Sequence, residues 1–186
     1  MTKGGGTLSQ WMYERFGSKR GFARFWLHKI KGLAGVYRQY QIQPGRAQGS
    51  RYVFVCSGNI CRSPLAEVYA RSLGMESASC GLNCGDDYPA DPRAREFALT
   101  NGLSLESHKT VNVRDFKFRQ TDLVVVMEPA HLDQFRSKVH QDLPLVLAGN
   151  HGKAQSPYIH DPFNCCPAYF ARCESMVMEC VRGMNA

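Results

Sequence analysis

Hydrophobic and polar positions repeat with two different periods along this chain, and the change comes about fifty residues from its start. In the first part, apolar side chains within residues 18–38 recur at steps of three and four, which is the spacing of one helix face. A shorter repeat over residues 8–16 predicts another helix, with Gly17 and Ser18 as a break and a cap between the two. Residues 41–50 contain proline and several glycines and are typical of a linker.

From residue 51 onward, short apolar runs alternate with helical patterns. Four strands separated by helices predict an α/β fold, a four-stranded parallel twisted sheet with helices on both faces. We therefore expect a helical extension over residues 1–50 and an α/β domain over residues 51–186. The expected strands are 52–55, 77–82, 122–127 and 143–147, and the expected helices are 63–73, 92–101, 129–138 and a last one that follows Asp161-Pro162 and ends near Arg182.

The net charge of +7 is concentrated in the extension. Residues 1–50 carry nine basic residues and one acidic residue, so the remainder carries 23 − 9 = 14 basic and 16 − 1 = 15 acidic residues. Because the larger part is close to neutral, we do not expect the chain as a whole to bind nucleic acid. No apolar run approaches the roughly 18 residues of a membrane span, and the first residues lack the apolar core of a secretory signal. The expected location is cytoplasmic.

Eight cysteines are too few for a disulfide scaffold in a chain of 186 residues, and they lack the paired spacing of structural zinc sites. A metal held by Cys80, Cys84, Cys165 and Cys166 is an alternative, but no companion histidine spacing supports it. We expect reduced thiols, no metal and no organic cofactor.

The segment from Cys56 to Ser63 contains the pattern Cys-x5-Arg between an expected strand and an expected helix. A tight loop at a helix N-terminus directs successive backbone N–H groups inward and forms an anion-binding nest. Gly58 and Asn59 tolerate the positive φ of such a loop, and Arg62 offers a planar fork of donors to two phosphate oxygens. The same positive field favours the thiolate of Cys56, so the pattern predicts attack on phosphorus and a phosphocysteine intermediate. The alternative is an inert buried cysteine.

The run V-C-S-G-N-I-C-R-S-P-L-A-E, which begins at Val55, resembles the signature of the low-molecular-weight protein tyrosine phosphatases. The resemblance continues as far as Asp161-Pro162-Phe163 and covers about residues 51–183. It implies that Cys56 attacks the phosphomonoester, Arg62 binds the phosphate, and Asp161 protonates the leaving phenolate and then activates water. A helix N-cap is the alternative role for Asp161.

The resemblance also implies supporting roles within the loop. Asn59 would hold the loop shape, and Ser63 would donate a hydrogen bond to the thiolate. Cys61 would form a reversible disulfide with the nucleophile, or would simply fill space. The expected phosphate-binding and supporting residues are Ser57, Gly58, Asn59, Ile60, Cys61 and Ser63.

Two positions that would form the substrate pocket wall depart from the family pattern. The loop after the second expected strand is small and acidic apart from Tyr88, and Phe163 stands where tyrosines are common. Phe163 and Tyr88 are nevertheless the aromatic residues expected to line the pocket. These departures leave the substrate preference open.

Two other reactions belong to the same architecture. Arsenate reductases use two further cysteines after the third strand, but residues 127–149 contain none. Protein-arginine phosphatases resemble this chain but carry threonine at the position of Ile60. Ile60 therefore favours an aryl phosphate, with a phosphotyrosine-containing protein as substrate.

Residues 1–40 admit several interpretations. Their amphipathic helix would pack on the catalytic domain or mediate self-association. Because it is strongly basic, binding to an anionic membrane surface or to an acidic partner protein is the main alternative. A disordered segment and a transit peptide are the others, although the stretch is short of serine.

Overall fold

The sheet is parallel throughout, with strand order β2-β1-β3-β4, in a computed structural model that describes residues 7–43, 45 and 49–185. Its strands are β1 (Arg51–Cys56), β2 (Ser77–Gly81), β3 (Asp122–Val126) and β4 (Leu145–Leu147). The expected four-stranded parallel sheet is therefore confirmed. The fourth strand is shorter than the sequence pattern indicated.

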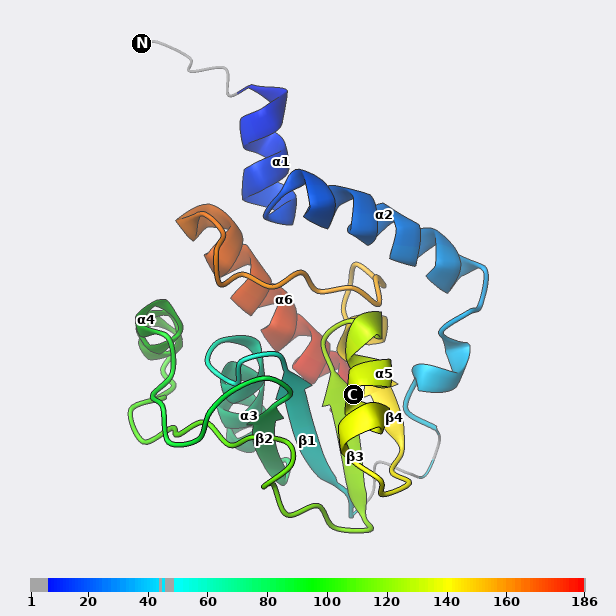
Figure 1. The fold of residues 1–186 in the computed structure, drawn as a ribbon. Coiled ribbons are helices and arrows are strands. Elements are labelled where there is room, and N and C mark those ends of the chain that lie inside the picture. Colours follow the sequence, from blue (N-terminus) through cyan, green and yellow to red (C-terminus); the bar gives the residue numbers. More distant parts are fainter. Residues whose placement is uncertain (1–6, 44, 46–48, 186) are drawn as a thin grey trace.

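Helices cover both faces of this sheet (Figure 1). On one face, Tyr52, Phe54 and Cys56 of β1 pack against α3 (Arg62–Ser72) and α6 (Pro167–Met184). On the other face, Val53 and Val55 pack against α5 (Pro129–Lys138). α4 (Pro92–Thr100) packs outside α3 through a smaller apolar cluster. Since the central strands are buried on both sides, they are almost continuously apolar, as parallel strands usually are.

The last helix starts later than expected. α6 begins at Pro167 with Cys166 in the cap position, so the sequence-based start after Asp161-Pro162 is wrong by about one and a half turns. Residues 161–166 instead form turns, in which the Phe163 N–H donates to Asp161 Oδ1 at 3.1 Å. The alternative of Asp161 as a helix N-cap is therefore also wrong, and its second carboxylate oxygen is free to contact another group.

The N-terminal part contains α1 (Leu8–Phe16) and α2 (Lys19–Leu33). Ser18 caps α2 as expected, because its Oγ accepts a hydrogen bond from the Gly21 N–H at 2.8 Å. The predicted helix over 18–38 is too long, since α2 ends before Gly35, whose φ of 81° is left-handed. A short 3-10 helix, Arg38–Tyr40, follows. Of the expected linker, Pro44 and residues 46–48 lie outside the described residues.

α1 and α2 form an outer layer over α6 and over the chain that leads into it (Figure 1). Phe16 and Tyr37 are buried, and Ser18 Oγ lies 3.2 Å from His160 Nε2. Gly17 and Gly21 allow this close approach, because a Cβ at either position would come within 3 Å of the His160 ring. The described part of the extension thus packs on the α/β part. Among the described residues, the helices are too short or too polar to cross a bilayer.

The close approach at Gly17 predicts a difference between two glycine substitutions. Gly17 and Gly35 share a positive φ, 79° and 81°, but a Cβ at Gly35 would have nothing within 4 Å, whereas one at Gly17 would lie 2.7 Å from His160 Cδ2. Gly35→Ala should lower the free energy of unfolding by about 1 kcal/mol through the positive φ alone. Gly17→Ala should lower it by about 2–3 kcal/mol, because overpacking adds to that strain. Urea unfolding measures both, and equal losses would contradict the packing described here.

Candidate active site

The loop after β1 lies at the carboxyl end of the sheet, where ligands of parallel sheets bind. Cys56 is the last residue of β1 and Arg62 is the first residue of α3, so the loop between them directs its backbone toward a helix N-terminus. Asn59 adopts a φ of 52°, which confirms the left-handed conformation expected there, whereas Gly58 does not have a positive φ.

The side chain of Asn59 stabilises this loop through three hydrogen bonds. Its Nδ2 donates to Ser63 Oγ and to Ser79 Oγ, each at 2.9 Å, and its Oδ1 accepts from the Val111 N–H at 3.0 Å. The backbone carbonyl oxygen of Asn59 lies 2.8 Å from His108 Nε2, which must carry the proton because a carbonyl only accepts. Asn59 and Ser63 are fully buried, so these hydrogen bonds fix the loop shape without contacting a ligand.

Two hydrogen-bond donors surround the sulfur of Cys56. The Asn59 N–H donates to Cys56 Sγ at 3.2 Å, and Ser63 Oγ lies 3.0 Å from the same atom. Ser63 Oγ also accepts from Asn59 Nδ2, and the Cys80 carbonyl, at 3.5 Å, is a second acceptor for its proton. Both contacts with Cys56 Sγ fix the position of the sulfur inside the loop.

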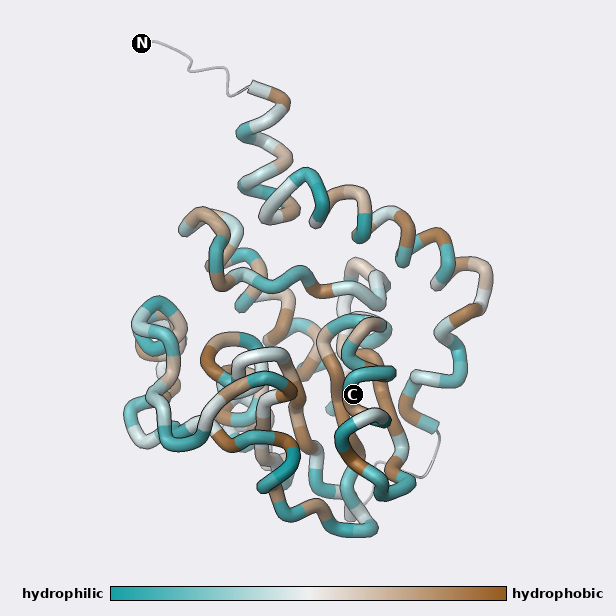
Figure 2. The backbone as a smooth tube through the Cα atoms, viewed as in Figure 1, coloured by the Kyte–Doolittle hydropathy of each residue, from teal (hydrophilic) through white to brown (hydrophobic). Residues whose placement is uncertain are grey.

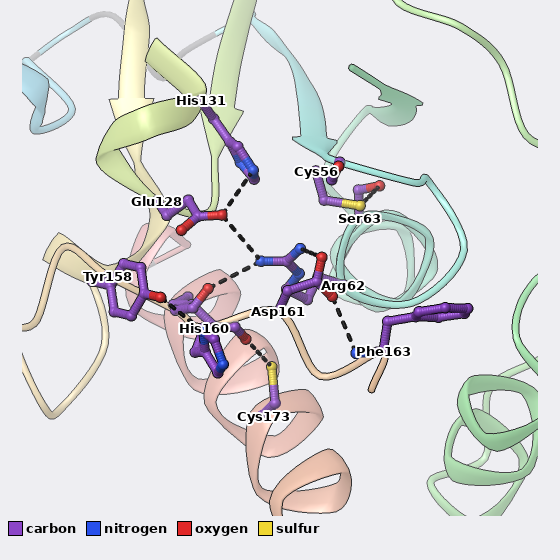
Figure 3. A network of polar contacts seen from close by, with 12 residues as sticks. Cys56, Arg62, Ser63, Glu128, His131, Tyr158, His160, Asp161, Phe163 and Cys173 are labelled. Carbon is purple, nitrogen blue, oxygen red and sulfur yellow. Dashed lines mark hydrogen bonds and ion pairs between the residues drawn. The ribbon is translucent and has the colours of Figure 1, made fainter. Parts of the chain in front are cut away.

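The guanidinium of Arg62 is almost entirely buried, with 1% of its side chain exposed, and lies between two carboxylates (Figure 3). Its Nη2 contacts Asp161 Oδ2 at 2.7 Å, and its Nη1 donates to the Ile159 carbonyl at 3.0 Å. Glu128 Oε1 lies 4.0 Å from Nη1. Burial alone would lower the pKa of Arg62, but Asp161 and the other nearby negative groups raise it above its usual value. The Nε of Arg62 has no hydrogen-bond partner among the described residues.

A cavity of about 190 Å³ brings most of the expected site residues together. Tyr88 is not among the residues that line it. Its side chain lies next to Gly85 and is 63% exposed, because the loop after β2 turns it toward solvent, so the expectation that Tyr88 forms a pocket wall is wrong. Phe163 is half-exposed at the cavity. The lining residues are Cys56, Ser57, Gly58, Ile60, Cys61, Arg62, Asp161 and Phe163.

The second loop cysteine, Cys61, is a buried free thiol that lines the same cavity. Burial raises the pKa of Cys61 well above its ordinary value, with Glu174 and Asp91 acting in the same direction. A disulfide between Cys56 and Cys61 stays a prediction. In the part of the chain that the structure describes, no group of three or more His, Cys, Asp and Glu side chains is arranged to hold a metal ion.

The sequence did not point to Glu128, which lies near the guanidinium of Arg62, or to His131, which contacts Glu128. Glu128 Oε1 lies 3.0 Å from His131 Nε2 (Figure 3). Burial alone would raise the pKa of Glu128, but His131 and then Arg62 lower it below its usual range, so Glu128 is a second negative charge facing the guanidinium. One signal was available: Glu128 follows β3 at its carboxyl end, the edge of the sheet that also carries Cys56.

Glu174 on α6 is a further buried acid that the sequence did not indicate. Neither carboxylate oxygen has a hydrogen-bond partner among the described residues. Burial raises its pKa to about 8, Arg62 opposes the shift, and Asp91 and Asp161 reinforce it. Glu174 is therefore mostly protonated at neutral pH, which avoids an unpaired charge in the core.

The raised pKa of Glu174 predicts a pH-dependent loss of stability. The folded chain binds this proton up to about pH 8, whereas an unfolded glutamate releases it near pH 4, so the stabilisation is complete below about pH 4 and is lost as the pH rises through 8. Glu174→Gln cannot ionise. Its free energy of unfolding relative to the wild type should therefore rise by on the order of 3–5 kcal/mol as the pH goes from 5 to 9. Urea unfolding across this range measures the difference. Glu179→Gln on the same helix is the control, and parallel curves for the wild type and Glu174→Gln would contradict the prediction.

Comparisons with known proteins agree with this geometry. The family model described as "Low molecular weight phosphotyrosine protein phosphatase" matches residues 51–186. The probable low molecular weight protein-tyrosine-phosphatase EpsP of Ralstonia nicotianae is 34% identical over 86 residues, which are 45% of this chain and 59% of that protein. Wzb of Escherichia coli strain K12, a low molecular weight protein-tyrosine-phosphatase, is 40% identical over 84 residues, 43% of this chain and 56% of that protein.

The chain thus spans less than two thirds of the length of these two curated relatives. Among solved structures, Vibrio vulnificus Wzb in complex with benzylphosphonate is similar with a TM-score of 0.63 at 25% sequence identity. That similarity covers 73% of this chain and 97% of the Vibrio chain. Residues 1–50 precede the segment that the family model matches.

Proposed function

Because this chain belongs to the low molecular weight phosphotyrosine protein phosphatase family, we propose that it hydrolyses protein phosphotyrosine through a phosphocysteine intermediate. The observation that carries the proposal is the meeting of three groups at one cavity: the hydrogen-bonded sulfur of Cys56, the buried guanidinium of Arg62 and the carboxylate of Asp161. The relatives named above are protein-tyrosine-phosphatases, which supports the same reaction class.

Phosphate binding would begin with an exchange of partners at Arg62. The backbone N–H groups of the loop and the guanidinium bind the phosphate oxygens, while Asp161 gives up its contact with Nη2. This exchange frees the Asp161 carboxyl group to face the oxygen of the leaving group. An acid that is paired with Arg62 in the free enzyme thus becomes a proton donor when the substrate is bound.

The chemistry proceeds in two displacements. In the first, Cys56 Sγ forms a bond to phosphorus, the bond from phosphorus to the phenolic oxygen breaks, and Asp161 transfers its proton to that oxygen. In the second, water attacks phosphorus, Asp161 takes a proton from the water, and the sulfur–phosphorus bond breaks to release inorganic phosphate. Ser63 and the Asn59 N–H stabilise the thiolate as it leaves.

Phe163 and Ile60 give the pocket its preference for an aromatic group. Phe163 is half-exposed beside the cavity, where its ring can stack on a phenyl group, and Ile60 adds an apolar wall. The Vibrio relative was solved with benzylphosphonate, a compound with the same combination of aryl group and phosphorus oxyanion. A thiolate nucleophile requires reduced cysteines, so we place the activity in a reducing compartment such as the cytoplasm.

The proposed acid predicts a selective defect in Asp161→Ala. Turnover of aryl phosphates with poor leaving groups should fall by about 100-fold or more, whereas activated esters should be slowed far less, because only a poor leaving group needs the proton. Steady-state kinetics over a series of substituted phenyl phosphates measures this dependence. Asp133→Ala, which removes an exposed carboxylate elsewhere, is the control. Equal slowing of all esters would refute the role of Asp161.

Cys56→Ser should abolish turnover of every ester and still bind a phosphate analogue.

A substrate panel tests the proposed function as a whole. One preparation is assayed with phosphotyrosine, phosphoserine and phosphoarginine peptides and with arsenate plus a thiol reductant. We expect hydrolysis of phosphotyrosine at least about 100-fold faster than that of phosphoserine, whose shorter side chain leaves its phosphate above the loop. Preferred hydrolysis of phosphoarginine would instead indicate a protein-arginine phosphatase, and reduction of arsenate would indicate an arsenate reductase.

A further inference from the structure

Exposed apolar side chains are concentrated on the two N-terminal helices and the turn after them. Eleven large hydrophobic residues are exposed in the part of the chain that the structure describes, and eight of them fall between residues 8 and 36. Figure 2 shows hydrophobic positions recurring along α2, at the outer rim of the molecule. The eight residues are Leu8, Trp11, Tyr13, Trp26, Leu27, Ile30, Leu33 and Val36.

One side of α2 contacts the rest of the protein. Another side is largely exposed, although Trp26 also lines a cavity between α2 and α6. The inner side of α2 contacts the chain before α6. A Cβ at Gly32 would lie 3.4 Å from Pro157, and the rings of His28 and Tyr158 stack with their centroids 5.4 Å apart. Trp26, Ile30 and Leu33 follow one another at steps of four and three and so share another side. Ile30 is 63% exposed and Leu33 is 77% exposed. We call Trp11, Trp26, Leu27, Ile30 and Leu33 the outer face.

Aromatic contacts join the two helices into one surface. The ring centroids of Trp11 and Phe16 are 5.6 Å apart, those of Phe16 and Phe22 are 5.0 Å apart, and those of Phe22 and Trp26 are 6.5 Å apart. This chain of edge-on rings fixes α1 relative to α2. The exposed apolar residues of both helices therefore belong to one rigid unit.

The two helices that carry the outer face are strongly basic. α1 and α2 contain six basic residues and one acidic residue, Glu14, which accepts a hydrogen bond from Gln10. Within the described ranges, none of the six forms an ion pair with a carboxylate. A cavity of about 290 Å³ between α2 and α6 is lined by two of these six cations, Arg15 and Lys29, by Arg172 of α6, and by no carboxylate. The six basic residues are Arg15, Lys19, Arg20, Arg24, Lys29 and Lys31.

We propose that the outer face docks this protein on an anionic membrane surface, with α2 lying in the plane of the interface. Apolar side chains enter the boundary between headgroups and acyl chains, tryptophan rings lie at headgroup depth, and lysine and arginine side chains reach the anionic lipids. The inference goes beyond the proposed hydrolysis of phosphotyrosine and does not depend on it.

Other occupants fit this surface less well. A second copy packed face to face would bring six cations against six, which like-charge repulsion opposes. Nucleic acid would neutralise the cations but would leave Ile30 and Leu33 against water or phosphate.

The test is sedimentation of the full chain with vesicles of phosphatidylcholine alone or with about 30% phosphatidylserine, at about 50 mM and about 500 mM salt. We expect binding to the phosphatidylserine vesicles at low salt and at least tenfold weaker binding at high salt or to phosphatidylcholine alone. The chain contains two tryptophans, and both belong to the outer face. Their fluorescence emission should therefore shift to shorter wavelength when the vesicles bind.

Two pairs of substitutions separate the apolar and the electrostatic contributions. Ile30→Gln with Leu33→Gln should weaken binding at least tenfold, with Leu99→Gln on α4 as the control for an exposed apolar residue. Arg20→Gln with Lys31→Gln should weaken it about thirtyfold, since each basic residue near an anionic surface contributes about 1 kcal/mol. Arg114→Gln with Lys117→Gln removes the same charge from the α/β part and should leave binding unchanged. Circular dichroism and hydrolysis of para-nitrophenyl phosphate check that each variant is folded.

The proposal is overturned if the wild type stays in solution with phosphatidylserine vesicles at low salt. It is overturned equally if the control pairs weaken binding as much as the outer-face pairs do. Self-association in analytical ultracentrifugation that Ile30→Gln with Leu33→Gln abolishes, without vesicle binding, would assign the face to a second copy instead. Because the readout is binding, failure of the proposed phosphatase activity would leave these results interpretable.

Discussion

A buried positive charge at Arg62 constrains the whole catalytic end of the sheet. A guanidinium that is almost completely removed from water is tolerated only when anionic and carbonyl groups surround it. Those groups come from different parts of the fold: Asp161 and the Ile159 carbonyl from the chain before α6, and Glu128 from the end of β3. The loop, β3 and the acid-bearing segment are therefore positioned by one shared requirement, and the binding of a phosphate satisfies the same charge in another way.

The extension adds a second set of contacts to this segment from the opposite side. Ser18 lies within hydrogen-bond distance of His160, which also contacts the Tyr158 hydroxyl at 2.7 Å, and His28 stacks on Tyr158. Asp161 follows directly in the chain. The segment that carries the proposed acid is thus held between Arg62 on the inside and α1 and α2 on the outside, so the two helices belong to the structural support of the site.

Local signals in the sequence were sufficient for the sheet, the phosphate loop and most helix starts. The apolar run before Cys56 and the Ser-Pro after Arg62 indicated a strand, a loop and a helix in that order, and Asn59 has the left-handed φ expected of it. Predictions failed where tertiary packing decides. Asp161-Pro162 has the composition of a helix start, yet the helix begins only at Pro167, and the Asp161 carboxylate contacts Arg62. The burial of Glu174 depends on neighbours distant in sequence, which no local pattern encodes.

The contact between the extension and the acid-bearing segment has an evolutionary consequence. Where Gly17 and Gly21 meet the His160 ring, neither partner tolerates added bulk unless the other shrinks. Substitutions at these positions should therefore occur together across lineages, and a lineage that discards the two helices must also replace the aromatic and imidazole groups that they cover. Covariation between positions 17–21 and 158–165 would then mark which descendants retain the two-layered arrangement.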